Sequence, residues 1–445
     1  VKGLKDEYVE FRTEKTADPK KRLPSRPKLA IESGNGFLDT GKLHQGYEVP
    51  IIGAVWQPRL WAYGINRFTL QSFKSGRGPQ RETELANRLD LFFTLQLTGT
   101  EKILLGLRSF DNNRPRDFTR YTFAGADSGY NGEFNLGVET FFFEGDLGSL
   151  FPNLDKVGVT PLDFGFTIGR QPLIFQEGIL INDTIDAVGL IRNNIPFPGA
   201  SNFRVSAIYA WNRVDRNDEE RKSDENLFGL FVAADTHTTT WNFDSIYIQD
   251  EGRGDGLYAG IAAIQRLQKW GGISTAFRIN ASLALEDEIP GNVIGNGVLF
   301  TSEISKTVPG SDDIVYFNAF LGLGNYTQAG REAIKGGPLA NTGVLFASPN
   351  LSTYGAEINP FIEDDTIGGA IGYQAFFDNK RRNIIFEIAS RYDLSGTGFD
   401  SLGFGVQLQQ AIGRHIQLQL ETFYVFNNEG REDGSGARVE VQVVY

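Results

Sequence analysis

The sequence predicts an all-β protein, a transmembrane antiparallel up-and-down β-barrel of about 18 strands with a partly ordered N-terminal extension. Three observations predict this fold class. Apolar and polar residues alternate with a period of two, short and long connections alternate between the strands, and the last strand ends on an aromatic residue.

The two-residue alternation recurs from about residue 57 to the C-terminus. In residues 89–97 the odd positions are all large and apolar, whereas the even positions include Asp90, Thr94 and Gln96. Residues 402–409 follow the same pattern. Successive side chains of a strand point to opposite faces of the sheet, so one face of each strand is polar. This pattern is typical of a soluble sheet with one wet face, or of a barrel with a water-filled lumen.

The connections distinguish these two alternatives. Short links such as 98–101 and 411–413 alternate with long polar links such as 111–131 and 325–366. Outer-membrane barrels have short periplasmic turns and long outer loops, a distribution that a soluble sandwich has no reason to show. Only the links 145–161 and 193–201 would be long inner turns. The predicted strands begin near residues 57, 86, 101, 133, 162, 184, 202, 226, 239, 256, 272, 296, 313, 367, 383, 401, 413 and 435.

The C-terminal strand supplies the third observation. Val439, Val441, Val443 and Tyr445 occupy every second position, and the chain ends on that tyrosine. The pattern is similar to the terminal-strand signal of outer-membrane proteins. A free edge strand is an aggregation hazard, so we expect this strand to pair with the first strand and close the barrel.

Composition excludes several other classes of protein. No window reaches the roughly 18 uninterrupted apolar residues of a transmembrane helix. The mean hydropathy is only -0.25, although the chain contains 35 Phe. Cysteine is absent, which excludes disulfides and thiolate sites, and the formal charge of -12 argues against a nucleic-acid partner. The chain does not begin with Met and is expected to be a processed mature form.

Enzymatic chemistry has little support in the sequence. The three histidines, His44, His237 and His415, share no metal-ligand spacing. His415 could act as the general base of a hydrolase, but the sequence near it does not indicate a serine nucleophile. We therefore predict no catalytic residue, no metal and no cofactor.

Charged residues on the polar face are expected to line a lumen. An Arg or Lys on the lipid face costs about 2–4 kcal/mol at the bilayer midplane, so these residues should point inward. Two interpretations remain open: the arginines form a ladder for an anionic solute, or Arg and Glu pair across strands and stiffen the wall. The predicted pore-lining residues are Arg88, Asp90, Lys102, Arg108, Glu139, Asp163, Asp186, Arg192, Arg204, Arg278, Glu303, Glu387, Arg391 and Glu421.

Two segments depart from the barrel pattern, which we place at residues 57–445. Residues 1–56 are predicted to be a periplasmic or lumenal extension, which either holds a partner protein or is a loosely ordered tail. The link 325–366 contains apolar runs at 343–347 and 358–361. Loops longer than about 12–15 residues are usually functional or disordered. We expect this one to fold inward, to cap the pore or to form an interaction surface.

The run Ile-Gly-Arg-Gln-Pro-Leu at 168–173, followed by Ile-Asp-Ala-Val-Gly-Leu at 185–190, resembles the alginate-export family of outer-membrane porins. Phosphate-selective porins have a similar Gly-Arg-Gln run. The resemblance implies an 18-stranded barrel that passes an anionic polysaccharide or related solute, with Arg170 in the lumen. Ala187 departs from the family's Gly. Arg170 also breaks simple alternation, so a bulge at Gly169 is expected to turn it inward.

The predicted function is a passive diffusion channel of the bacterial outer membrane for small polar or anionic solutes, saccharides among them. Its partners would be outer-membrane lipid, lipopolysaccharide and the solutes, with a periplasmic or envelope protein on the N-terminal extension. The alternative is a plugged structural barrel that scaffolds a partner protein in an envelope assembly.

Overall fold

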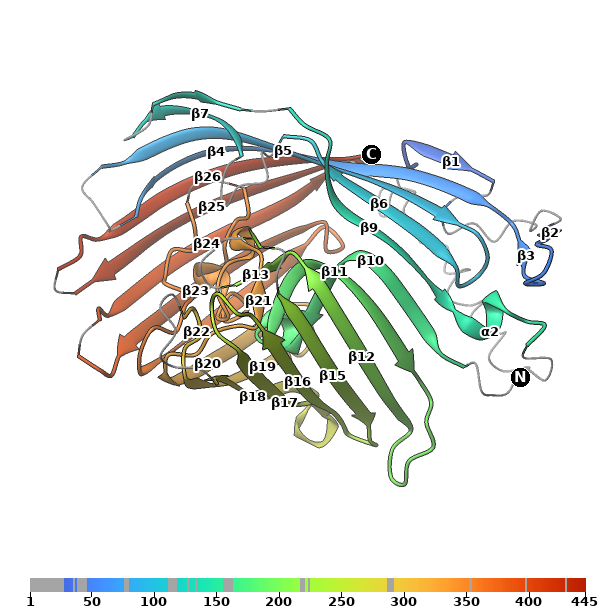
Figure 1. The fold of residues 1–445 in the computed structure, drawn as a ribbon. Coiled ribbons are helices and arrows are strands. Elements are labelled where there is room, and N and C mark those ends of the chain that lie inside the picture. Colours follow the sequence, from blue (N-terminus) through green and yellow to red (C-terminus); the bar gives the residue numbers. More distant parts are fainter. Residues whose placement is uncertain are drawn as a thin grey trace.

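The computed structural model describes residues 28–34, 37, 46–75, 80–110, 118–125, 128–132, 134–154, 163–216, 221–222, 225–285, 292–351, 354–396, 398–428 and 430–445. Within these ranges the chain forms one closed barrel of antiparallel strands (Figure 1). In the described part of the chain, no helix is both long enough and apolar enough to cross a membrane.

The wall of the barrel consists, in the described residues, of 18 strands that follow the order of the sequence. The largest differences from the predicted starts are at the second strand, which begins at Glu82, and the fourth, which begins at Gly137. The wall strands are β4 (Arg59–Lys74), β5 (Glu82–Gln96), β6 (Lys102–Arg108), β9 (Gly137–Asp146), β10 (Gly165–Phe175), β11 (Ile181–Arg192), β12 (Asn202–Asn212), β15 (Asn226–Asp235), β16 (Thr239–Gln249), β17 (Gly256–Leu267), β18 (Ile273–Ala284), β19 (Gly297–Thr307), β20 (Ile314–Gly324), β22 (Thr366–Phe377), β23 (Arg382–Asp393), β24 (Ser401–Ile412), β25 (Ile416–Asn427) and β26 (Gly434–Val444).

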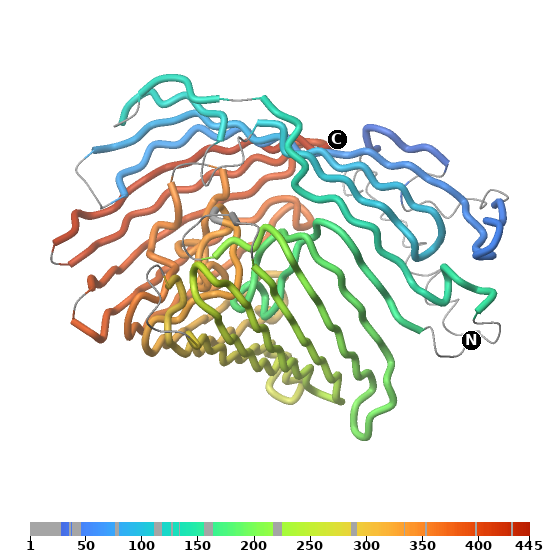
Figure 2. Tube along the Cα trace, viewed as in Figure 1, coloured from blue at the N-terminus to red at the C-terminus, as the bar shows by residue number. Residues whose placement is uncertain are grey.

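The last strand closes the ring on the first. β26 pairs with β4 from Ser435 opposite Lys74 to Val444 opposite Ile65. The terminal tyrosine continues the ladder, because Tyr445 N donates to Gly64 O at 3.1 Å. The predicted fold class is therefore confirmed, and the C-terminal strand pairs as its alternation indicated. Figure 2 follows the chain from hairpin to hairpin around the ring.

Short strands and helical turns lie outside the wall ladder. β7 (Thr119–Ala124) and β8 (Gly129–Asn131) extend the sheet beside the outer half of β5, and β1 (Ile31–Ser33) pairs with β4 at its inner end. Residues 1–27, 35–36 and 38–45 of the predicted N-terminal extension lie outside the described residues. The other short elements are β2 (Tyr47–Glu48), β3 (Val55–Trp56), α2 (Leu147–Leu150), η2 (Gln176–Gly178), β13 (Val214–Asp215), β14 (Arg221–Lys222), η3 (Gln268–Trp270), β21 (Gly330–Arg331), η4 (Ala333–Lys335) and η5 (Val344–Phe346).

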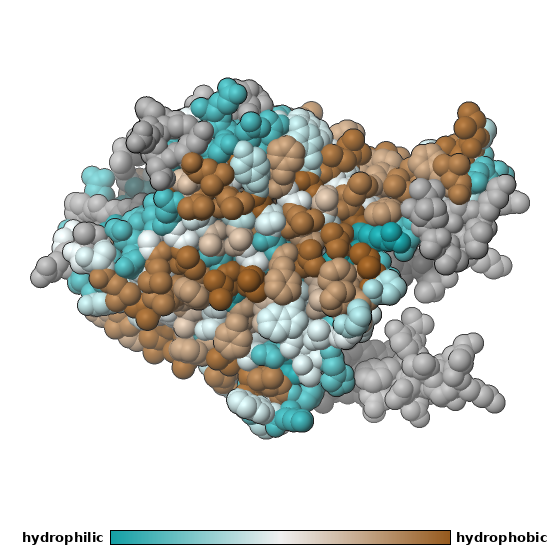
Figure 3. All heavy atoms as spheres, turned by 60° about the horizontal axis from the view of Figure 1, so that its bottom comes forward, coloured by the Kyte–Doolittle hydropathy of each residue, from teal (hydrophilic) through white to brown (hydrophobic). Residues whose placement is uncertain are grey.

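Large apolar side chains cover the outside of the wall. They recur at every second position, for example Phe386 and Ile388 on β23, which are 50% and 46% exposed. Figure 3 shows hydrophobic side chains spread over much of the surface in view. Soluble monomers do not expose apolar area on this scale, whereas lipid-facing strands do. The barrel therefore spans a membrane.

The tops of β10 and β11 leave the wall and turn into the lumen. β9 pairs with β10 only as far as Arg170, and β12 pairs with β11 only from Asp186, where the register shifts. Beyond these points β10 and β11 still pair with each other but no longer with their wall neighbours β9 and β12. We call residues 171–185 the inner hairpin. Gly169 precedes it with φ +122, and a Cβ there would meet the carbonyl oxygen of Phe141.

Candidate functional site: the lumen and its constriction

The link between β20 and β22, residues 325–365, lies inside the barrel and packs on the wall through an apolar core. We call it the lumenal loop. Leu345 covers Gly403 and Gly405 on β24, where side chains would leave it no room. The ring of Tyr354 lies 4.1 Å from that of Phe73 on β4 (between centroids). Inward-facing residues of these wall strands are thus apolar where the loop covers them.

The inner hairpin forms a second core against the opposite part of the wall. Leu180 and Ile181 are fully buried there, and Phe175 stacks on Phe231 of β15 with centroids 3.4 Å apart. The lumenal loop joins this hairpin through β21, which pairs in parallel with Ile181 and Asn182. The two segments therefore form one continuous insert in the lumen.

Three arginines on successive wall strands hold the lumenal loop, and we call them the arginine row. Arg67 donates to Pro349 O at 3.0 Å, and Arg88 donates to Asn350 O at 2.9 Å. Arg108 pairs with Glu332 of the loop at 2.8 Å. Arg67 and Arg88 are direct cross-strand neighbours. The loop is thereby tied to β4, β5 and β6.

Each member of the arginine row also pairs with a wall carboxylate. Arg67 binds Glu440 at 2.6 Å, and Arg88 binds Asp90 at 2.7 Å. Arg108 lies 3.3 Å from Asp90. Of the two arrangements that the sequence left open, these positions show the pairing of arginine with carboxylates, not a ladder of free arginines. The charges of the wall and the loop therefore largely neutralise one another.

Wall charges also anchor the insert elsewhere in the lumen. Arg278, which is 1% exposed, binds Glu303 of β19 and Glu177 at the tip of the inner hairpin, both at 2.6 Å. Glu387 accepts hydrogen bonds from two loop amides, Val344 N and Leu345 N, both at 2.9 Å. Buried carboxylates and guanidinium groups need such partners, and here the insert supplies them.

Most of the predicted pore-lining residues point into the barrel, although most of these contact other protein groups. Arg391 donates to Asn359 O and Phe361 O of the loop, Lys102 pairs with Glu144, and Arg204 is exposed to the lumen. Asp163 is exposed, just before β10. The residues on the inward face are Arg88, Asp90, Lys102, Arg108, Glu139, Arg204, Arg278, Glu303, Glu387, Arg391 and Glu421.

Arg170, Asp186 and Arg192 do not share this orientation. They occupy the same row as Ile168 and Leu190, which are 49% and 47% exposed on the outside. The prediction took the opposite face of β11 as lipid-facing because it carries apolar residues. That face is apolar because the inner hairpin and its core cover it from within.

The bulge expected at Gly169 is also absent. The register of β10 runs unshifted through this glycine against both β9 and β11. Arg170 pairs with Asp186 at 2.9 Å at the outer end of the wall. The register irregularity lies instead between Asp186 and Ala187, opposite β12.

Several charged residues of the site escaped the prediction. Arg67, Arg438 and Glu440 follow the alternation of β4 and β26, so the same reasoning could have found them. A buried cluster in the outer links could not be found this way. There Arg216, which is 0% exposed, binds Asp250 at 3.1 Å. Its sequence context is that of a solvated loop.

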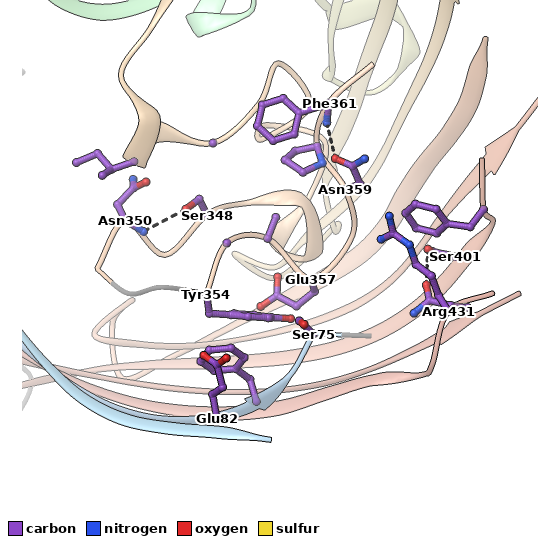
Figure 4. Close-up of a pocket in the computed structure, with 18 of the residues that line it drawn as sticks. Ser75, Glu82, Ser348, Asn350, Tyr354, Glu357, Asn359, Phe361, Ser401 and Arg431 are labelled. Atoms are coloured by element: carbon purple, nitrogen blue, oxygen red, sulfur yellow. Dashed lines mark hydrogen bonds between the residues drawn. The ribbon is translucent and has the colours of Figure 1, made fainter. Parts of the chain in front are cut away.

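Two cavities remain beside the lumenal loop. The inner cavity, of about 500 Å³, is lined by Arg67, Asp90, Glu421 and Arg438 with the amides of Gln407, Gln419 and Gln442. The outer cavity, of about 190 Å³, lies between the loop and the outer ends of β4, β5, β24 and β25 (Figure 4). Ser348 and Asn350 line both cavities. The stretch 348–350, which Arg67 and Arg88 hold, therefore separates them.

The histidines considered as catalytic residues lie apart from this site. His415 sits in the turn between β24 and β25, and its Nδ1 lies 2.7 Å from Val444 O. His237 is exposed in the turn between β15 and β16. Within the described ranges, no group of three or more His, Asp or Glu is arranged to hold a metal ion.

The barrel is similar to solved structures of bacterial outer-membrane proteins. OccK7 (OpdD) of Pseudomonas aeruginosa matches with a TM-score of 0.55 at 10% identity, covering 87% of this chain and 99% of that one. OccAB3 of Acinetobacter baumannii matches with 0.54 at 10% identity, covering 86% and 98%. OpdK of P. aeruginosa, an outer membrane protein whose structure was solved with vanillate, matches with 0.54 at 12% identity, covering 86% and 98%.

These similarities show the fold. No protein family model matches the chain, and no curated protein matches it. The resemblance to the alginate-export family is therefore not confirmed, whereas the coarser assignment to the porin-type barrel is. The apolar exterior and the shared fold place the barrel in the bacterial outer membrane.

Proposed function

We propose that the protein is a passive diffusion channel for small polar or anionic solutes, saccharides among them. The observation that carries the proposal is the lumen, where only residues 348–350 separate a polar inner cavity from an outer cavity. The solute would pass this stretch of the lumenal loop. We further propose that residues 57–445 form the channel and residues 1–56 an extension of it.

The inner cavity suits solutes rich in oxygen. Arg67 and Arg438 offer guanidinium donors, although Asp90 and Glu421 in the same lining balance their charge, and the amides of Gln407, Gln419 and Gln442 both donate and accept hydrogen bonds. Hydroxyl and carboxylate groups match such a lining. The structure of OpdK was solved with vanillate, a carboxylate, which supports this class of solute for a related barrel shape.

Planar-bilayer recording tests the channel directly. We expect stepwise currents from the refolded protein, because the two cavities are separated only by a short stretch of loop. Liposome swelling with neutral, cationic and anionic sugars then ranks the solutes, and we expect cationic sugars to enter most slowly. Equal swelling rates for all three would contradict the charge preference while leaving the channel intact.

The alternative, a plugged barrel that scaffolds an envelope partner, is supported by a specific observation. The lumenal loop contacts the wall on several sides, through Arg67, Arg108 and Glu387 among others. Folded barrels that carry no current in any salt would favour this alternative. In that case, a partner retained by the full chain but lost on removal of the N-terminal extension would identify what the scaffold holds.

A further inference from the structure

The outer cavity has the features of a binding site. It is enclosed by the lumenal loop on one side and by the outer ends of the wall strands on the other (Figure 4). Its volume of about 190 Å³ exceeds the share of several liquid waters, roughly 30 Å³ each. A molecule of roughly ten heavy atoms would fill it.

Two carboxylates face this cavity without an ionic partner. Glu82 comes from the start of β5 and Glu357 from the lumenal loop, and both turn into the cavity (Figure 4). Neither forms an ion pair with any other described residue, in contrast to the carboxylates that pair with the arginine row. The Oε2 atom of Glu357 is buried and has no hydrogen-bond partner in the described structure. A buried carboxylate oxygen in this state lacks the compensation that such groups normally have.

The rest of the lining is apolar and amidic. The rings of Phe73, Phe118 and Tyr354 form part of the wall, and Asn427 and Ser401 lie opposite the loop. Arg431 also lines the cavity, where its guanidinium lies against the ring of Phe399. The site therefore offers negative charge beside a surface suited to a short apolar body.

We propose that the outer cavity binds a small organic amine, with the ammonium group at Glu82 and Glu357 and an apolar body against the aromatic rings. An ammonium supplies the ion-pair partner that both carboxylates lack among the described residues, and a donor for the unpartnered Oε2 of Glu357. The proposal goes beyond the proposed channel function, because it assigns a recognition site of opposite charge preference at the outer mouth of the lumen.

The protonation of Glu357 supports the assignment. Burial raises its pKa well above the usual range, and the nearby Glu421 adds to this effect, whereas Arg438 acts in the opposite direction. The charge of Glu387 also raises the pKa of Glu357. The other charged side chains that line the cavity are Glu82 and Arg431. A raised pKa means that protons compete with an ammonium for Glu357, so amine affinity should rise with pH until the ligand itself loses its charge.

A matched series of three probes tests the site on the detergent-folded full chain. The probes are phenethylamine, 2-phenylethanol and 3-phenylpropionate, which share a body and differ in charge. We expect ligand-observed NMR to report binding of the amine only. Glu357→Gln and Glu82→Gln should each weaken it about tenfold, the loss expected for one charged hydrogen bond. Glu251→Gln, an exposed carboxylate on the β16–β17 link, serves as the control.

Two results would overturn the proposal. One is equal binding of the amine and the carboxylate, and the other is amine binding that neither glutamine variant weakens. Since binding is measured without a membrane, failure here leaves the conductance test unaffected. A silent barrel that still binds the amine would refute the channel and retain the site. The heat-dependent gel shift of each variant verifies that its barrel has formed.

Discussion

At the scale of single residues, the arginine row shows why arginine and not lysine stands at these positions. Arg67 uses Nε and Nη2 on Glu440 and Nη2 also on Pro349 O. Arg88 likewise grips Asp90 while Nη1 reaches Asn350 O. A planar guanidinium can serve a carboxylate and a carbonyl at once, whereas an ammonium acts as a single point charge. Each side chain therefore links the wall to the loop.

Replacing Arg88 by Lys should release the loop while retaining the charge. The hydrogen bond to Asn350 O would be lost, and one such bond from a charged donor contributes about 1.5–3 kcal/mol. We expect open events in bilayer recordings to become at least about fivefold more frequent. Arg266→Lys is the matched control, since this inward-facing arginine of β17 has no hydrogen bond or ion pair with the described residues of the loop. Identical opening frequencies in both variants would show that the row does not restrain the loop.

Glu357 should make barrel stability depend on pH. Its folded-state pKa is raised, so the stabilising proton is fully present below the unfolded value and is lost as the pH rises through the folded value. Glu357→Gln should therefore melt like the parent near about pH 4 and at a higher temperature than the parent near about pH 8. Thermal unfolding followed by the gel shift measures this. A constant difference across the range would argue against a buried protonated carboxyl.

At the scale of elements, the inner hairpin explains where reading the sequence failed. Alternation predicted the wall because one face of every wall strand meets lipid and the other meets the lumen, and β5, β23 and β24 follow this pattern over most of their length. On β11 both faces are apolar, since Leu190 faces lipid and Ile185 is buried in the core of the inner hairpin. A period-two pattern cannot tell which apolar face is outside, and choosing the wrong one reverses every side chain.

Gly169 is the residue that the inward turn of this hairpin requires. Its φ of +122 is rarely adopted by other residues, and a side chain would collide with the carbonyl of Phe141. Gly169→Val should cost about 1–3 kcal/mol and shift the gel-shift transition to lower temperature. Gly99→Ala, in a turn with open space around it, should leave the transition unchanged. If both variants melt alike, the turn tolerates a side chain and this reading of Gly169 is wrong.

At the scale of the whole molecule, the sequence was sufficient for the wall and insufficient for the lumen. The wall depends on the alternation of apolar and polar residues and on the pairing of the last strand with the first. Both can be predicted from local sequence patterns. The insert depends on pairing between residues far apart, such as Gly330 with Ile181 and Arg108 with Glu332. Its only local signals were the apolar runs of the lumenal loop, which indicated burial but could not name the partners.

Removing the lumenal loop tests the division between wall and insert. Gly322 pairs with Thr366, and Gly324 N donates to Asp365 Oδ1 at 2.7 Å, so β20 and β22 end side by side and a short turn can join them. A variant with residues 326–363 replaced by a four-residue Gly/Ser turn should still close its barrel, because no wall pairing is lost. We expect its single-channel conductance to exceed that of the parent several-fold, since the obstruction at 348–350 is gone. A folded variant with unchanged conductance would mean that the loop does not limit passage, and the constriction would then have to lie at the inner hairpin.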